Sequence, residues 1–202
     1  GDQVENVFGD PELPAADYLL HPYIVRDGGT LIFGPRGRGK STTLLYMAVQ
    51  IDAGCEGVFE VERARRVLFV NLERSRESLV RRLTRMNQAL GLDPRRPLAM
   101  LNVRGRSLLD IADKIQAAVD SKGIELVVID SLSRAGVELT KDDQANKAVD
   151  ILNAFGTWVA VAHEPKGVKA KNASVFGSSM FENAADIVAR LSSEEKADGS
   201  EL

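Results

Sequence analysis

The sequence predicts an α/β domain with a mostly parallel central sheet flanked by helices. Short, uninterrupted apolar runs, such as residues 126–129, are typical of strands that are buried on both faces of a parallel sheet. These runs alternate with longer stretches in which apolar residues recur at helical spacing, and glycines separate the two kinds of segment. The chain has 202 residues, 44% of them hydrophobic, which favours one domain with extensions.

The predicted elements follow one another as strand and helix along the chain. Strands are predicted over 30–33, 67–70, 98–103, 126–129, 158–162 and 186–191. Helices are predicted over 41–49, 79–90, 108–119 and 145–155, and the second and third end at Gly91 and near Gly123. The segments 134–142 and 164–175 are predicted loops. Right-handed crossovers would place the carboxyl ends of these strands along one edge of the sheet, where ligands bind in such folds.

The most informative segment of the sequence is the one that directly follows the first predicted strand. It fits the phosphate-loop pattern G-x-x-x-x-G-K-[ST] at every fixed position, and its residues are Gly34, Pro35, Arg36, Gly37, Arg38, Gly39, Lys40 and Ser41, with Thr42 next. Glycines let successive backbone N–H groups turn toward a polyphosphate, and the following helix N-terminus favours negative charge. We expect Lys40 to reach the β- and γ-phosphates and the Ser41 hydroxyl to bind Mg²⁺. Strand, loop and helix together predict a nucleoside triphosphate site rather than an incidental glycine-rich turn.

Three polar residues are predicted at the carboxyl ends of other strands. Asp130 fits a carboxylate that orients Mg²⁺, Glu73 a general base for the attacking water, and His163 a sensor of the γ-phosphate. Each has a plainer interpretation: a cap for Asp130, a favourable charge at a helix N-terminus for Glu73, and a satisfied strand-end histidine for His163. Together with Gly34, these residues place suitable groups at four strand ends, which favours the catalytic interpretation.

The formal net charge of −3 conceals a basic block between residues 63 and 106. The block holds twelve arginines against three acidic residues, an excess of nine positive charges. Several of the arginines share the polar face of the predicted second helix: Arg76, Arg81, Arg82 and Arg85. The block is either a surface for an anionic partner or a solvated helix face with a few ion pairs, and the sequence leaves both open.

The cysteine content and the hydropathy of the chain predict its environment. Cys55 is the single cysteine, which excludes an internal disulfide and suits a reducing cytoplasm. No uninterrupted apolar run approaches the ~18 residues of a membrane span, and no signal peptide begins the chain. We therefore expect a cytoplasmic protein without a membrane partner.

Five segments, in their order along the chain, resemble a RecA-type ATPase core. These segments are GPRGRGKST, VLFVNLE, LVVIDSLSR, VAVAHEPK and VFGSSMFENAADIVARL. Within that superfamily the chain is most similar to the group of RepA-like hexameric helicases, with KaiC- and DnaB-type ATPases further off. The resemblance covers residues 29–191 and implies a RecA-like ATPase domain there. The segment before it, 1–28, begins with a polar, proline-broken stretch and is predicted to be an irregular extension, and residues 192–202 are predicted to be an acidic tail.

The resemblance also implies a role for each site residue. It places Lys40 and Ser41 on phosphate and Mg²⁺, with ATP and Mg²⁺ as ligands. Glu73 would be the catalytic carboxylate, Asp130 the Mg²⁺-orienting residue and His163 the γ-phosphate sensor. The loops after Asp130 and His163 would face a channel for single-stranded DNA or RNA in a homo-oligomeric ring or filament, and the second loop carries three lysines suited to phosphate contacts: Lys166, Lys169 and Lys171.

The sequence departs from this family at two places. Glu164 and Pro165 stand where RepA-like relatives often have a histidine or hydroxyl residues. Val175 and Phe176 precede the Gly-Ser-Ser element at 177–179, where many relatives place an arginine that reaches the neighbouring subunit's nucleotide. The arginine finger is therefore unassigned, and its candidates are Lys169, Lys171 and Arg190.

Three functions compete on this evidence. A nucleic-acid-dependent ATPase, either a helicase motor or a loader, is favoured by the arginine block and the loop lysines. A KaiC-like ATP-driven switch that acts through protein partners is favoured by the aromatic content of only 5%, because single-strand binders commonly stack bases on aromatic rings. A small-molecule kinase fits worst, since no arginine-rich lid is visible. We expect the nucleic-acid-linked ATPase and keep the switch as its alternative.

Overall fold

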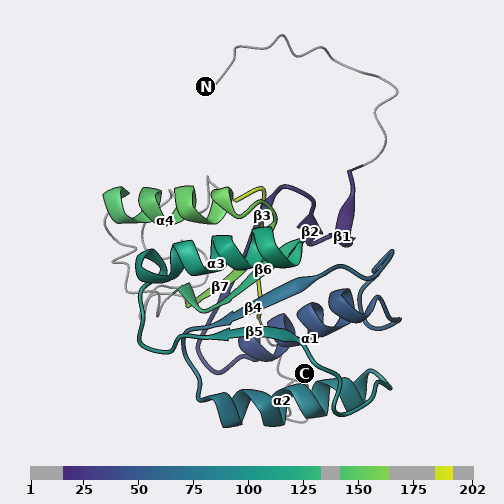
Figure 1. Cartoon of the computed structure of the whole chain (residues 1–202). Coiled ribbons are helices and arrows are strands. Elements are labelled where there is room, and N and C mark those ends of the chain that lie inside the picture. The colour runs from purple at the N-terminus through teal and green to yellow at the C-terminus, as the bar shows by residue number, and fades with distance from the viewer. Residues whose placement is uncertain (1–15, 133–141, 164–184, 193–202) are drawn as a thin grey trace, which may run out of the picture.

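The computed structural model describes residues 16–132, 142–163 and 185–192. Its central element is a six-stranded sheet, with helices α1 and α2 on one face and α3 and α4 on the other (Figure 1). The strands of this sheet are β3 (Gly29–Gly34), β4 (Val67–Asn71), β5 (Ala99–Asn102), β6 (Leu126–Asp130), β7 (Trp158–His163) and β8 (Ile187–Arg190). The helices are α1 (Lys40–Ala53), α2 (Arg76–Ala89), α3 (Leu108–Lys122) and α4 (Asp142–Ala154).

The sheet is parallel throughout, and its strand order is β5-β4-β6-β7-β3-β8. This arrangement confirms the predicted α/β class with a RecA-like P-loop core. All six predicted strands form, although β5 is shorter than the predicted 98–103. Helix α1 runs past its predicted end to Ala53, because the first left-handed glycine that can close it is Gly54. Since the strands are parallel, their carboxyl ends lie along one edge.

Two hydrophobic cores fill the space between the sheet and its helices. Alternate side chains of one strand enter different cores: Leu31 and Phe33 of β3 pack toward α3 and α4, whereas Ile32 packs toward α1 and α2. Because helices cover both faces of the sheet, the side chains on both sides of each central strand are buried. This explains why the strand sequences are uninterrupted apolar runs. Within the described ranges, no helix combines the length and the apolar composition needed to cross a membrane.

A short hairpin precedes the sheet, in a segment where the sequence analysis expects an irregular extension. It is formed by β1 (Tyr18–Leu20) and β2 (Ile24–Val25), which pair antiparallel. Leu19, Leu20 and Ile24 are buried in the core that also contains the apolar residues of α1. The apolar cluster is too short to show a period, so the sequence pattern alone did not reveal these strands.

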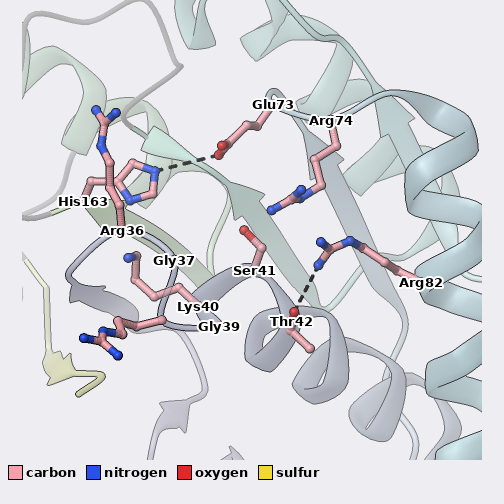
Figure 2. A pocket seen from close by; sticks show the side chains of 11 residues that line it. Arg36, Gly37, Gly39, Lys40, Ser41, Thr42, Glu73, Arg74, Arg82 and His163 are labelled. Atoms are coloured by element: carbon pink, nitrogen blue, oxygen red, sulfur yellow. Dashed lines mark hydrogen bonds and ion pairs between the residues drawn. The ribbon is translucent and has the colours of Figure 1, made fainter. Parts of the chain in front are cut away.

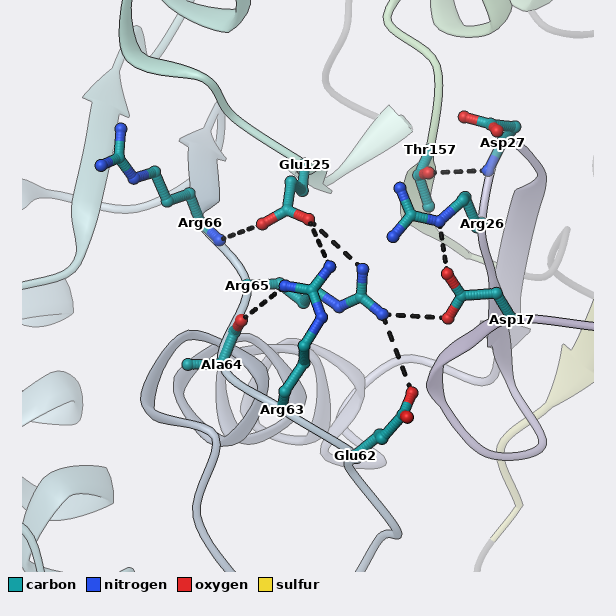
Figure 3. Close-up of polar contacts among 10 residues, drawn as sticks. All are labelled: Asp17, Arg26, Asp27, Glu62, Arg63, Ala64, Arg65, Arg66, Glu125 and Thr157. Carbon is teal, nitrogen blue, oxygen red and sulfur yellow. Dashed lines mark hydrogen bonds and ion pairs between the residues drawn. The ribbon is translucent and has the colours of Figure 1, made fainter.

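An ion-pair cluster at the amino ends of the strands joins this hairpin to the sheet (Figure 3). The Arg65 guanidinium is 2% exposed and donates to Asp17 at 2.9 Å and to Glu125 at 3.3 Å. Asp17 also accepts from Arg26, and Arg63 adds a contact to Glu125 at 3.4 Å. Because these residues immediately precede or follow β1, β2, β4 and β6, part of the arginine block is structural.

Candidate active site

The phosphate loop occupies the turn between β3 and α1. Gly37 and Gly39 have φ values of 80° and 82°, in the left-handed region that glycine adopts without steric cost. Gly39 is the N-cap residue of α1, and its carbonyl accepts hydrogen bonds from the N–H groups of Thr42 and Thr43. The glycines at these two positions therefore set the path by which the chain enters the helix.

Lys40 lies at the first position of α1 and is only 4% exposed. Its ammonium donates a hydrogen bond to the Gly34 carbonyl at 2.7 Å and another to the Pro35 carbonyl. Both acceptors belong to the loop itself, so the positive charge is held against the loop rather than extended into solvent. The predicted phosphate-contacting lysine is thus placed in the phosphate loop.

Ser41 and Asp130 meet across the sheet edge, from α1 and the last position of β6. The Ser41 hydroxyl donates to Asp130 Oδ1 at 2.8 Å, and the Asp130 side chain is buried. Burial raises the pKa of Asp130; the Ser41 hydrogen bond and the positive charges of Arg74 and Arg82 act in the opposite direction. A hydroxyl and a carboxylate oxygen are hard donors, and Mg²⁺ in nucleotide sites takes one or two such ligands together with phosphate oxygens. This pair therefore fits Mg²⁺.

Glu73 and His163 also come together at this edge. His163 Nε2 lies 3.9 Å from Glu73 Oε2, and the Ser131 hydroxyl donates to the same oxygen at 3.2 Å. Glu73 does not directly follow the strand as the sequence analysis expects: β4 continues to Asn71, and Glu73 lies two residues farther along. Ser131 was not predicted as a site residue, because only the pairing of β4 with β6 brings it beside the glutamate.

The turn that carries Glu73 is held by the fully buried Asn71. Its Oδ1 accepts from the N–H groups of Glu73, at 3.3 Å, and Arg74, at 2.9 Å. Its Nδ2 donates to the Arg74 carbonyl at 2.8 Å and to Asn102 Oδ1 on β5 at 3.0 Å. Asn71 therefore fixes the backbone from which the glutamate projects. Sequence reasoning missed it, although an asparagine within an apolar strand is the signal that could have found it.

These residues surround a cavity of about 540 Å³ (Figure 2). It is lined by Arg36, Gly37, Arg38, Gly39, Lys40, Ser41, Thr42, Glu73, Arg74, Arg82 and His163. Arg74 and Arg82 are additions to the predicted site: Arg82 was assigned to the polar face of its helix and Arg74 had no role. The Arg82 guanidinium donates to Thr42 Oγ1 at 3.0 Å. Burial lowers the pKa of Arg82, and the nearby positive charge of Arg74 lowers it further.

The predicted nucleic-acid contacts cannot be placed in the same way. Lys166, Lys169 and Lys171 lie outside the described residues, as does the predicted loop at 164–175; of the predicted loop at 134–142 only Asp142 is described, and it begins α4. Their roles stay predictions.

A phosphate loop, a glutamate and a histidine line one cavity at the carboxyl edge of a parallel sheet, and a buried aspartate is hydrogen-bonded to the serine of the loop; together they define a P-loop ATPase. The comparison with protein families agrees with this class. The model of the AAA domain family matches residues 2–169, most of the chain, so the protein belongs to this family and has a nucleotide-binding ATPase domain. The sequence has no significant match among curated proteins.

Proposed function

We propose that this protein is a RepA-like ATPase that couples Mg²⁺-dependent ATP hydrolysis to work on single-stranded nucleic acid, as a motor or a loader. The observation that carries the nucleic-acid part is a basic groove of about 470 Å³ beside the catalytic turn. The basic groove is lined by Arg74, Ser75, Arg76, Asn102, Val103, Arg104, Arg106 and Lys114. It comes from the end of β5, the loop that follows, and the facing parts of α2 and α3.

Hydrolysis requires a water molecule, a base and a stabilised leaving group. Glu73 accepts a proton from the water as the water oxygen attacks the γ-phosphorus; the bond from phosphorus to the β–γ bridging oxygen breaks, giving ADP and inorganic phosphate. The Ser131 hydroxyl and His163 lie against the same glutamate oxygen and orient the carboxylate. Lys40 contacts the phosphates, and His163 senses the γ-phosphate. Mg²⁺, held by Ser41 and Asp130, neutralises phosphate charge when bound.

The charges of the basic groove fit a phosphodiester backbone. Its lining contains five cationic side chains and no carboxylate, and none of the five forms an ion pair with another described residue. Guanidinium groups bind phosphate through two parallel hydrogen bonds. No aromatic ring lines the groove, so contacts would go to phosphates rather than bases and would carry no sequence preference. Arg74 lines both the groove and the nucleotide cavity, which provides a route for coupling.

The same proposal includes a homo-oligomeric ring or filament, in which the lysines at 166, 169 and 171 add phosphate contacts in a central channel. It rests on the resemblance to RepA-like helicases, whose nucleotide sites lie between subunits.

The test compares ATP turnover with and without single-stranded DNA and RNA. We expect the wild type to be stimulated, and the double variant Arg104→Ala/Arg106→Ala to keep its basal turnover and lose stimulation. Loss of two phosphate contacts should also flatten the log–log salt dependence of binding by about 1.4, at roughly 0.7 for each contact. Arg81→Ala/Arg85→Ala is the matched control, because these arginines are exposed on α2 and line neither cavity.

The alternative is a KaiC-like switch that acts through protein partners. It is favoured by the low aromatic content of the chain and by the lack of rings along the groove. If the nucleotide-loaded wild type does not bind labelled single strands even at low salt, the switch replaces the nucleic-acid motor.

A further inference from the structure

We propose that Arg74 is a catalytic residue that supplies, from the same chain, the cation usually expected from a neighbouring subunit. In this role its guanidinium binds the γ-phosphate and stabilises the charge that develops as the bond to the leaving ADP breaks. The inference rests on ATP hydrolysis at this site and is independent of the nucleic-acid partner.

The position of Arg74 is the first observation. It directly follows Glu73, in the turn between β4 and α2, and its side chain lines the nucleotide cavity together with Lys40 and Ser41. Figure 2 shows its guanidinium pointing into that cavity. A group at this position lies on the side of the cavity where the attacking water and its base must meet the γ-phosphate.

The charge of Arg74 is not neutralised by a carboxylate within the described part of the protein. It forms no ion pair there, and its Nε is buried without a hydrogen-bond partner among the described residues. Its positive charge adds to the lowering that burial causes in the pKa of Arg82, and it partly offsets the burial that raises the pKa of Asp130. Repulsion between Arg74 and Arg82 in one cavity destabilises the folded protein unless an anion lies between them. A triphosphate supplies that negative charge.

The backbone of Arg74 is held on both sides. Asn71 accepts a hydrogen bond from its N–H and donates one to its carbonyl. The next residue, Ser75, is the N-cap of α2, and its hydroxyl accepts from the Ser78 N–H at 3.3 Å. Because the turn is anchored to the sheet and to the helix, the backbone position from which the Arg74 side chain projects is fixed. A preorganised cation stabilises developing charge without further rearrangement.

The chemistry at the γ-phosphate explains what this cation does. As the water oxygen bonds to phosphorus, the electron pair of the breaking P–O bond moves to the β-phosphate of ADP and the proton of the water moves to Glu73. In the transition state negative charge is spread over the three γ-phosphoryl oxygens and develops on the leaving oxygen, and a guanidinium can bind two of these oxygens at once. Arg74 keeps its own protons throughout. Arg74 thus takes, within its own chain, the arginine-finger role that the sequence analysis leaves unassigned.

The kinetic test uses the full chain without nucleic acid. Arg74→Ala should lower kcat by at least about 100-fold and raise KM for Mg-ATP by roughly tenfold, since an arginine finger is worth about 10³–10⁵ in kcat and KM approaches the dissociation constant of ATP when chemistry is slow. Arg74→Lys should recover part of this loss, because it restores charge without the planar fork. Arg81→Ala, an exposed arginine of the same helix, is the control and should match the wild type in turnover. Turnover by Arg74→Ala within about threefold of the wild type overturns the proposal.

Binding measurements separate this role from a structural one. A fluorescent ADP should bind Arg74→Ala as tightly as the wild type, whereas a non-hydrolysable ATP analogue should lose about tenfold in affinity, or ~1.4 kcal/mol. An equal loss for both nucleotides, or a fall in melting temperature that Arg74→Lys reverses without restoring turnover, overturns the proposal. This measurement needs no turnover, so it remains decisive if the wild type hydrolyses ATP too slowly to assay, a result that would count against the proposed function instead.

Mixing two inactive variants tests whether the arginine acts within its own chain. Glu73→Gln lacks the base but retains Arg74, whereas Arg74→Ala lacks the cation but retains Glu73. If Arg74 acts within one chain, no site in a mixture has both groups, and turnover stays at the sum of the separate variants. Recovery of turnover on mixing shows that the arginine reaches a neighbouring site and overturns the proposal.

Discussion

At the scale of single residues, the site depends on adjacent side chains of opposite charge. Glu73 shares its Oε2 with the Ser131 hydroxyl and lies 3.9 Å from His163. Arg74 projects into the same cavity from the next position. The proposed base for the water and the proposed cation for the phosphate are thus consecutive residues of one turn. Both roles can be tested by changes that preserve side-chain shape.

Glu73→Gln tests the base. The change keeps the shape and the acceptor for Ser131 but cannot take a proton, so we expect kcat to fall by about 10²–10⁴. Nucleotide binding and the melting temperature should change little. Glu77→Gln is the matched control, because Glu77 carries the acidic charge of the first turn of α2. If Glu73 only stabilises the helix dipole, both variants lower the melting temperature and turnover stays near that of the wild type.

At the scale of secondary-structure elements, Asn71 joins the end of β4 to the turn and to β5. Its amide uses both its oxygen and its nitrogen, and three of its four contacts are to the backbone of the turn. An apolar side chain at this position would leave those backbone groups without a partner. Asn71 therefore stabilises the turn that follows β4, and the positions of Glu73 and Arg74 depend on that turn.

Asn71→Ala should lower both stability and turnover. Leaving buried polar groups unpaired costs about 1–3 kcal/mol, which denaturant unfolding measures. Turnover should fall by more than tenfold, because even a small displacement of Glu73 and Arg74 from their positions lowers the rate of the chemical step strongly. Asn102→Ala removes only the 3.0 Å bond between the two amides, so both effects should be smaller. Equal effects of the two variants would show that the strand pairing, and not the turn, is what Asn71 supports.

At the scale of the whole molecule, arginines of the basic block have different surroundings, three of which bear on the site and the fold. Arg63 and Arg65 belong to the ion-pair cluster at the amino ends of the strands. At the opposite edge, Arg82 lines the nucleotide cavity and Arg104 lines the basic groove. Some arginines are therefore paired within the fold and others line cavities, and the binding of an anionic partner by the second group stays a prediction.

The ion-pair cluster predicts a dependence of stability on pH. Burial raises the pKa of Glu125, but hydrogen bonds from the Arg66 N–H and Arg65 outweigh it and hold that pKa below its usual value. Its stabilising contribution is therefore present above the unfolded pKa of about 4.3 and is lost as the pH falls through the lower folded pKa.

Glu125→Gln should accordingly lower the free energy of unfolding at pH 7 by roughly 1–3 kcal/mol, as for a hydrogen bond to a charged group. The difference from the wild type should shrink as the pH falls below about 4. Melting temperatures of both proteins from pH 7 to 3.5 measure it. A difference that stays constant over this range would assign the effect to packing rather than charge.

The sequence by itself determined the six strands of the main sheet, the phosphate loop and the positions of Asp130 and His163 at strand ends. These features are local: an apolar run marks a buried strand, and Gly34 to Ser41 carry their chemistry in their own spacing. Asp130 and His163 could be predicted because they end β6 and β7, and parallel strands bring their carboxyl ends to one edge. A local sequence pattern was sufficient to predict the position of a residue wherever that position follows from the fold class alone.

Only the tertiary structure decided which polar side chains meet. Helical spacing assigns Arg82 to a polar face, but the contact between α1 and α2 turns that face toward Thr42. The pairing of β4 with β6 puts Ser131 beside Glu73, fifty-eight residues away in sequence. Arg65 and Arg74 belong to the same basic block, yet they lie at opposite ends of β4 and have different partners. Such contacts depend on strand order and helix packing, which no short stretch of sequence encodes.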